Sequence, residues 1–200
     1  MRLKYIFIKR FIDIIAAYIL LSVCYIPMII IAIAIKISDG GPVIFRQIRI
    51  GLYGKRFVCY KFRTMRCDAP REMSTKEFTN AGEYITPVGA FLRRTSLDEL
   101  PQLFNVLAGE MSLVGPRPLI PNEKEIHELR KNFGVYNVRP GITGLAQVCG
   151  RDRLGDLRKV ECDAIYASNS SFFCDMYIVL ATVIGVLRRD GINDLSKTAP

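Results

Sequence analysis

The sequence predicts an α/β protein of the α+β kind, mostly helical, in which a long apolar N-terminal segment precedes a small domain with a short β-hairpin. Three observations carry this prediction. Residues 14–35 contain no charged side chain. Alternating apolar and basic residues flank a glycine-containing turn soon afterwards. Helical patterns separated by glycine and proline fill the rest of the 200 residues, which suffice for one domain with a hydrophobic core.

The uncharged segment is long enough to form a membrane helix. As an α-helix, its 22 residues would extend about 33 Å, which matches the hydrocarbon core of a bilayer. Pro27 removes a backbone donor and kinks such a helix near its middle. Basic residues flank both ends of the segment: Arg2, Lys4, Lys9, Arg10 and Lys36. Two topologies therefore stay open: a spanning helix, and a re-entrant helix that enters and leaves on one side.

The remaining elements follow from periodicity and turn residues. After a turn at 39–42, two strands are expected at 43–49 and 56–64, joined by a turn at 51–55. Helices are expected at 88–94, 97–107, 121–131, 158–167 and 171–189, a mobile loop or short helix at 66–86, and loops at 109–121 and 139–144. The helix at 171–189 fits either a core helix or an amphipathic helix at a membrane surface. We divide the chain into a membrane segment, 1–38, and a second domain, 39–200.

Composition narrows the classes of partner. The net charge of +9 is typical of proteins that bind nucleic acid, anionic membranes or phosphorylated substrates. The aromatic residues form no RNA-binding signature, and the apolar N-terminal segment favours a membrane, so we expect no nucleic-acid partner. The six cysteines include no CxxC pair and the chain has one histidine, so we expect no zinc site. The thiols are expected to be reduced, in a domain that faces the cytosol.

An acid pair within the block 95–118 is the most informative feature of the chain. Asp98 and Glu99 stand among apolar residues, where a charge is costly without a partner. Arg117 is held between two prolines, and Lys61 and Arg63 fall on one face of the second expected strand. Acids, a fixed guanidinium and a lysine are the components of a phosphoryl-transfer site. The simpler alternatives are a helix N-terminus that favours acids and a solvated basic strand edge.

Five segments in order give the chain a family resemblance. They are GPVIFRQ at 41–47, YKFRTM at 60–65, the block 95–118, RPGITG at 139–144 and AQVCGR at 146–151. With these segments, the chain resembles the bacterial sugar transferases of the monotopic polyprenol-phosphate phosphoglycosyl transferase family from about residue 9 to 191. Small members of that family often carry Ser-Pro at the helix break, whereas this chain has Ile26-Pro27.

The resemblance implies an enzyme at the cytoplasmic face of the bacterial plasma membrane. It would transfer a sugar-1-phosphate from a UDP-sugar, by family habit a UDP-N-acetylated hexosamine, to undecaprenyl phosphate and release UMP. This would begin the assembly of a capsule, O-antigen, exopolysaccharide or glycoprotein glycan. The resemblance also implies a Mg²⁺ ion, a covalent enzyme intermediate, a re-entrant helix broken at Pro27 and contact with membrane lipids. A homodimer is compatible with the pattern.

The resemblance also assigns roles to residues. Asp98 would be the nucleophile and a ligand of Mg²⁺, with Glu99 as its helper in deprotonating or positioning the acceptor phosphate. The expected substrate-binding residues are Lys61, Arg63, Arg117, Arg139, Gln147 and Arg151; for Arg139 and Arg151 a structural salt bridge is the alternative. The rival function is a membrane-anchored basic binding module without catalysis, in which Asp98 and Glu99 would be dispensable. A basic nucleic-acid binder is a weaker rival.

Overall fold

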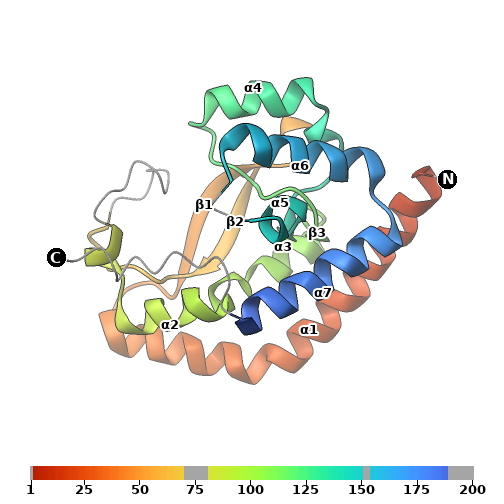
Figure 1. The fold of residues 1–200 in the computed structure, drawn as a ribbon. Helices are drawn as coiled ribbons and strands as arrows, with labels where there is room; N and C mark the ends of the chain where they lie inside the picture. The colour runs from red at the N-terminus through yellow and green to blue at the C-terminus, as the bar shows by residue number, and fades with distance from the viewer. Residues whose placement is uncertain (1, 70–80, 151–153, 189–200) are drawn as a thin grey trace.

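The apolar N-terminal segment forms one long helix, α1, from Arg2 to Asp39. The computed structural model describes residues 2–69, 81–150 and 154–188. The part Tyr5–Asp39 is long and apolar enough to cross a membrane. Only 6% of its most apolar 18-residue stretch is buried inside the fold. Pro27 lies inside the helix, and Figure 1 shows α1 bending beyond its middle. The predicted long apolar helix is therefore confirmed, with most of its apolar side chains exposed.

The predicted hairpin is also confirmed. Its strands pair antiparallel, with Phe45 opposite Lys61 and Arg49 opposite Phe57. Because directly opposed residues share a face, these four side chains lie on the same side of the hairpin. The strands are β1, Ile44–Ile50, and β2, Arg56–Phe62, and the turn between them contains the 3-10 helix η1, Leu52–Gly54.

A second, smaller sheet occupies two regions that were predicted as loops, and there the prediction is wrong. Strands β3, Ser112–Val114, and β4, Gly141–Thr143, pair in parallel. Glycines permit this pairing, because a Cβ on Gly141 would lie 2.1 Å from the nitrogen of Gly115. Each strand has three residues, too few for an alternating pattern to be recognised in the sequence.

The other predicted helices are present, with one division. The helix predicted at 97–107 is split into a 3-10 turn and an α-helix around Pro101, which lacks an amide hydrogen and so favours a helix start. The α-helices are α2, Pro87–Thr95; α3, Gln102–Ala108; α4, Lys124–Asn132; α5, Leu145–Val148; α6, Asp156–Asn169; and α7, Phe172–Arg188. The 3-10 turns are η2, Ala81–Tyr84; η3, Leu97–Glu99; and η4, Val135–Asn137.

The core forms where α1 meets the hairpin and the helices above it (Figure 1). Ala17 of α1 packs with the inner hairpin face and with α3, while Ile31 and Ile35 pack against Phe62 and Leu92. A third cluster joins β3 to α6 and α7 through Val114, Tyr166 and Ile178. The helix α1 thus serves as one wall of the folded domain along much of its length.

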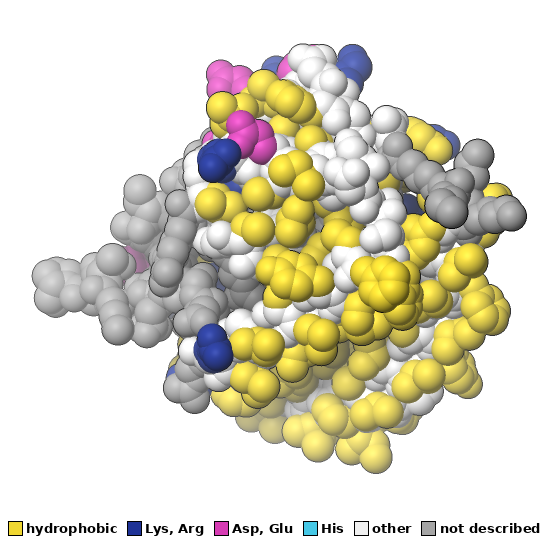
Figure 2. All heavy atoms as spheres, turned by 45° about the vertical axis from the view of Figure 1, so that its right-hand side comes forward, with side chains coloured by type: hydrophobic (Ala, Val, Ile, Leu, Met, Phe, Trp, Pro, Cys, Tyr) yellow, Lys and Arg dark blue, Asp and Glu magenta, His cyan; other side chains and the backbone are white. Residues whose placement is uncertain are grey.

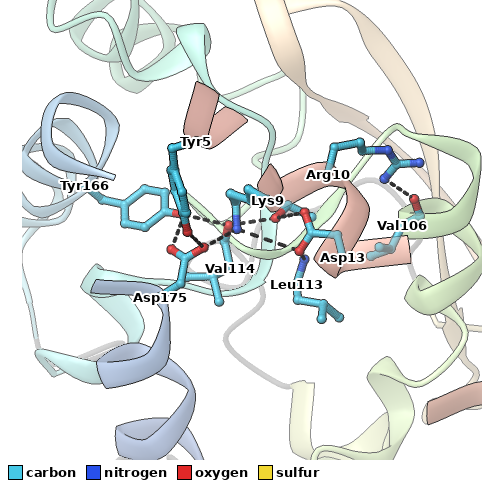
Figure 3. A network of polar contacts seen from close by, with 10 residues as sticks. Tyr5, Lys9, Arg10, Asp13, Val106, Leu113, Val114, Tyr166 and Asp175 are labelled. Carbon is cyan, nitrogen blue, oxygen red and sulfur yellow. Dashed lines mark hydrogen bonds and ion pairs between the residues drawn. The ribbon is translucent and has the colours of Figure 1, made fainter. Parts of the chain in front are cut away.

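A polar network fastens the first turns of α1 to the rest of the fold (Figure 3). Asp13 is 4% exposed and accepts hydrogen bonds from the Ser112 hydroxyl at 2.7 Å and the Leu113 amide at 3.2 Å. The ammonium of Lys9 lies between Asp13 and Asp175 of α7. Because these carboxylates are paired with cations or amides, they can be buried in an otherwise apolar helix contact.

Large apolar side chains cover the outer faces of α1 and α7. Figure 2 shows apolar side chains gathered over the lower part of one side of the molecule. We call this surface the apolar face. Its exposed residues on the two helices include Phe7, Phe11, Tyr18, Val23, Ile26, Ile30, Phe173, Tyr177, Leu180, Ile184 and Leu187. Soluble monomers rarely expose contiguous apolar patches of this extent, so the face indicates contact with an apolar partner or phase.

Candidate active site

The acid pair lies in a sharp turn between two helices. Ser96 ends α2 in the left-handed region, with φ of 58° and ψ of 15°, and the turn η3 follows directly. This conformation costs a non-glycine residue about 1–2 kcal/mol, and such residues gather at functional sites. The turn leaves Asp98 only 9% exposed.

Two of the predicted cations converge on the acids. The ammonium of Lys61, near the end of β2, lies 2.6 Å from Glu99 Oε1 and 4.0 Å from Asp98 Oδ2. A guanidinium nitrogen of Arg117, which follows β3, lies 3.3 Å from the same Glu99 oxygen. Residues far apart in the chain therefore meet at one point, as the sequence predicted for Lys61, Asp98, Glu99 and Arg117.

The two acids have opposite pKa shifts. Burial by itself would raise the pKa of Glu99, but the charges and hydrogen bonds of Lys61 and Arg117 outweigh burial and lower it to about 2. Burial raises the pKa of Asp98; the charge of Lys61 opposes this rise, and the charge of Glu99 adds to it. Glu99 is thus a fixed anion, whereas Asp98 is the more basic carboxylate of the pair, which favours nucleophilic attack.

Two arginines that were not predicted from the sequence also lie close to the acid pair. Arg49 donates hydrogen bonds to the Pro118 carbonyl at 3.1 Å and to Gln47 Oε1 at 2.5 Å. Its pKa is lowered to about 10, chiefly by burial and then by the positive charge of Arg117, while Glu99 acts in the opposite direction. The hairpin register was the available signal, because it puts Arg49 on the face that carries Lys61.

Arg93 is the second arginine near the acid pair that was not predicted from the sequence. It lies in the last turn of α2 and donates from Nε to the Thr64 hydroxyl at 2.8 Å. Burial lowers the pKa of Arg93, and the negative charge of Asp98 acts against that shift. The charge of Arg93 in turn helps to keep Asp98 ionised. The sequence held only a weak signal for this role, since arginines near helix C-termini are common.

The structure takes Arg63 away from the acid pair. A guanidinium nitrogen of Arg63 lies 2.6 Å from Asp39 Oδ2, and another donates to Cys67 Sγ at 3.1 Å. The strand was expected to run to residue 64, but β2 ends at Phe62, so strand alternation does not place Arg63 on the face that carries Lys61. Arg63 therefore joins the end of α1 to the hairpin.

Arg139 and Gln147 make backbone contacts. Arg139 Nε donates to the Gly109 carbonyl at 2.9 Å, at the end of α3, where Arg10 also bonds two carbonyls. Arginines in this position satisfy the unpaired carbonyls of a helix C-terminus. Gln147 Nε2, in α5, donates to the Ile142 carbonyl of β4 at 3.0 Å. Arg151 lies outside the described residues.

The acids fit one mode of magnesium binding. Among the described residues, no group of three or more His, Cys, Asp or Glu side chains could hold a metal ion by itself. Magnesium is commonly held by one or two carboxylates together with substrate phosphates. Glu99 Oε1 has Lys61 at 2.6 Å and Arg117 at 3.3 Å, whereas Asp98 Oδ2 has Lys61 at 4.0 Å, so Asp98 is the carboxylate better placed for such a shared ion.

Comparison with known proteins identifies the family. The family model for bacterial sugar transferases matches residues 4–189. The chain is 40% identical over 192 residues to the uncharacterized sugar transferase EpsL of Bacillus subtilis (strain 168), covering 93% of this chain and 90% of that protein.

Two longer relatives have more specific names. The undecaprenyl-phosphate galactose phosphotransferase of Salmonella typhimurium is 39% identical, covering 92% of this chain and 41% of that protein. The UDP-glucose:undecaprenyl-phosphate glucose-1-phosphate transferase of Xanthomonas campestris pv. campestris is 42% identical, covering 80% of this chain and 34% of that protein. The chain thus spans less than half the length of these two relatives. With nearly its whole length matched, the chain belongs to the bacterial sugar transferase family.

Proposed function

We propose that the protein transfers a sugar-1-phosphate from a UDP-sugar to undecaprenyl phosphate and releases UMP, as the first membrane step of glycan assembly. One observation carries the proposal: a buried carboxylate, Asp98, whose pKa is raised, lies beside Glu99, which is held by Lys61 and Arg117. The names of the Salmonella and Xanthomonas relatives support this reaction for a member of their family.

The first half-reaction is attack by Asp98 on the phosphorus that carries the sugar. A bond forms between a carboxylate oxygen of Asp98 and that phosphorus, and the bond from phosphorus to the oxygen bridging the two phosphates breaks. The bridging oxygen leaves with UMP. Lys61 and Arg117 supply positive charge beside the reacting phosphoryl group, where charge accumulates in the transition state.

The second half-reaction returns Asp98 to its free state. An oxygen of undecaprenyl phosphate attacks the same phosphorus, and the bond to the Asp98 oxygen breaks, which yields undecaprenyl diphosphate sugar. Two steps allow a soluble donor and a lipid acceptor to use one site in turn. The pKa of Glu99, about 2, makes it a weak base, so we assign it the positioning of Lys61 and Arg117 in preference to proton abstraction.

Magnesium would complete the site. Asp98 would hold it together with oxygens of the donor diphosphate. When bound, such an ion neutralises phosphate charge and stabilises the leaving group.

We further propose a monotopic arrangement at the cytoplasmic face of the plasma membrane. The apolar face supports it, because α1 and α7 expose large apolar side chains that lipid would cover. Pro27 permits α1 to break and turn back within the bilayer. A re-entrant helix would leave the acid pair at the interface where a soluble nucleotide sugar meets the phosphate of a polyprenol.

The proposed reaction is tested by measuring UMP release from a panel of UDP-sugars with undecaprenyl phosphate. The panel includes UDP-glucose, UDP-galactose and the UDP-N-acetylhexosamines. Release with one donor, dependent on the acceptor in multiple turnovers, is the expected result. Absence of release with every donor, from protein that is folded and membrane-bound, would favour the basic binding module instead.

Replacing Lys61 with methionine is expected to shift the acidic limb of the kcat/KM profile to higher pH. Asp98 must be ionised to attack, so activity falls as the pH drops through its pKa. The Lys61 ammonium lowers that pKa, and its loss therefore raises it. Lys55→Met, in the exposed hairpin turn, is the matched control and should leave the limb in place. An unchanged limb in Lys61→Met would contradict the role of Asp98 or its coupling to Lys61.

Both ends of α1 are expected to lie on the cytoplasmic side. After replacement of the native cysteines, single cysteines at positions 2 and 36 are labelled in intact cells with a membrane-impermeant reagent. The re-entrant topology predicts that neither position reacts until the cells are opened, because basic residues at both ends resist translocation. Labelling of position 2 from outside, with position 36 protected, means that the helix spans the membrane.

A further inference from the structure

The short segment that carries Arg117 is held in an unusual way. Pro116 and Pro118 have no amide hydrogen, so this stretch cannot be fixed by the donors that normally hold a strand. Its carbonyls are held instead, four in succession. The carbonyls of Pro116, Arg117, Pro118 and Leu119 accept hydrogen bonds from the Gly141 amide at 2.9 Å, Arg130 Nη1 at 2.8 Å, Arg49 Nη1 at 3.1 Å and the Ile50 amide at 3.0 Å.

The donor to Arg117 itself belongs to a buried ion pair. Arg130 of α4 is 4% exposed and Asp163 of α6 is 1% exposed. One guanidinium nitrogen of Arg130 contacts Asp163 Oδ2, and the other reaches the Arg117 carbonyl. The planar guanidinium can bridge the two acceptors, which a lysine ammonium at the same place would do poorly. The pair therefore ties α4 and α6 to the backbone of Arg117.

Stability alone is a poor explanation for this pair. Removing two charges from water costs about as much as their attraction returns, and apolar replacements are often no less stable. Positional precision is a better explanation. The Arg117 side chain is about half exposed and lies 3.3 Å from Glu99. The direction in which its guanidinium points therefore depends on a rigid backbone. A shift of about 1 Å in such a group can reduce turnover up to about 100-fold.

We propose that Arg130 and Asp163 are positioning residues for Arg117: the buried pair holds the Arg117 carbonyl so that the guanidinium meets Glu99 and the substrate phosphate. The role in turnover rests on the proposed function. Arg130 contacts the backbone carbonyl of Arg117, and Asp163 contacts Arg130, so the pair influences the site through Arg117. Arg49 supports the same segment at Pro118.

A double-mutant cycle tests the proposal. Arg130→Met with Asp163→Asn removes the pair without leaving a buried charge, and it is compared with Arg117→Ala and with the combination. We expect the pair replacement to lower kcat/KM about 10- to 100-fold and to have no further effect when Arg117 is alanine. An equal loss in both backgrounds would mean a general structural role and would overturn the proposal. Arg158→Gln with Glu161→Gln, an exposed pair on α6, should leave kcat/KM unchanged.

Amide hydrogen exchange provides a readout that does not depend on activity. The amides of Gly141 and Ile50 donate to the same segment. Both should exchange faster in the pair variant than in the exposed-pair control, at a pH and temperature where thermal melting shows both variants folded. Unchanged exchange at both amides would refute the proposal that Arg130 and Asp163 hold the Arg117 segment. If the natural protein releases no UMP from any donor, the proposed function fails. Amide exchange still tests whether Arg130 and Asp163 hold the Arg117 segment.

A second variant covers the case in which the pair replacement does not fold. Arg130→Lys keeps a positive charge opposite Asp163 but lacks the planar fork that reaches both acceptors. It should show faster exchange at Gly141 and Ile50 and a loss of kcat/KM that disappears when Arg117 is alanine. Full activity together with unchanged exchange in Arg130→Lys would overturn the proposal.

Discussion

Asp98→Asn is expected to abolish sugar-phosphate transfer, with a fall in turnover on the order of 10⁴-fold or more, as for other enzymes that lose their nucleophile. The amide keeps the shape of the side chain but cannot attack phosphorus as a carboxylate does. The natural protein, incubated with its donor and no acceptor, should gain the mass of one sugar phosphate on Asp98. The variant should gain none.

The same substitution should not weaken the fold. The pKa of Asp98 is raised in the folded state, so above that pKa its charge destabilises the fold, and this penalty disappears as the pH falls through it. A neutral asparagine removes the penalty, and the melting temperature at neutral pH should stay the same or rise. Asp68→Asn, an exposed acid paired with Arg66, is the control and should keep full activity.

Substantial turnover by Asp98→Asn would remove the covalent mechanism. It would also favour the basic binding module as the main role of the protein, since that alternative makes both acids dispensable. Glu99→Gln should be severely impaired as well, because Lys61 and Arg117 lose the anion on which they converge. Its residual activity should exceed that of Asp98→Asn, since the nucleophile remains.

Removal of divalent cations is expected to stop the reaction almost completely. The Glu99 carboxylate already offsets part of the positive charge of Lys61 and Arg117 before a donor binds. Two nitrogens of Arg49 are engaged by the Pro118 carbonyl and by Gln47. A diphosphate donor brings additional negative charge that these groups do not fully neutralise. Excess EDTA should therefore abolish UMP release, and Mg²⁺ should restore it better than Ca²⁺, which prefers more oxygen ligands.

The control is EDTA that has been saturated with Mg²⁺ beforehand, which should have no effect. Full activity in excess free EDTA would show that the cations of the protein suffice. A variant that keeps the nucleophile, such as Lys61→Met, should still require Mg²⁺ for its remaining activity.

Much of the secondary structure could be predicted from local sequence patterns. Alternation predicted the hairpin because each of its strands has seven residues and one face is buried. The long apolar helix followed from the absence of charge. The helix predicted at 88–94 is present as α2, and the structure adds its N-cap, where Thr86 accepts a hydrogen bond from the Gly89 amide. The parallel pair β3 and β4 could not be predicted, since each strand is short and its partner lies about thirty residues away.

The residues of the candidate site also fall into those that the sequence predicted and those that it did not. The sequence selected Asp98, Glu99, Lys61 and Arg117, and the structure brings these four together. It did not select Arg49 or Arg93, whose chemistry depends on which chain segments are neighbours. It grouped Arg63 with Lys61 by alternation, but the strand ends between them, and Asp39 captures the arginine.

By itself, the sequence determined the long exposed helix, the hairpin and the identity of the acid pair, because spacing and charge along one stretch of chain suffice for these features. Only the tertiary structure decided which cations face the acids, which arginines cap α3 and what holds Arg117 in place. Those outcomes depend on contacts between distant segments, such as Arg130 with Asp163 and Asp13 with β3. Burial makes each such charge require a partner, but it does not specify in advance which segment supplies it.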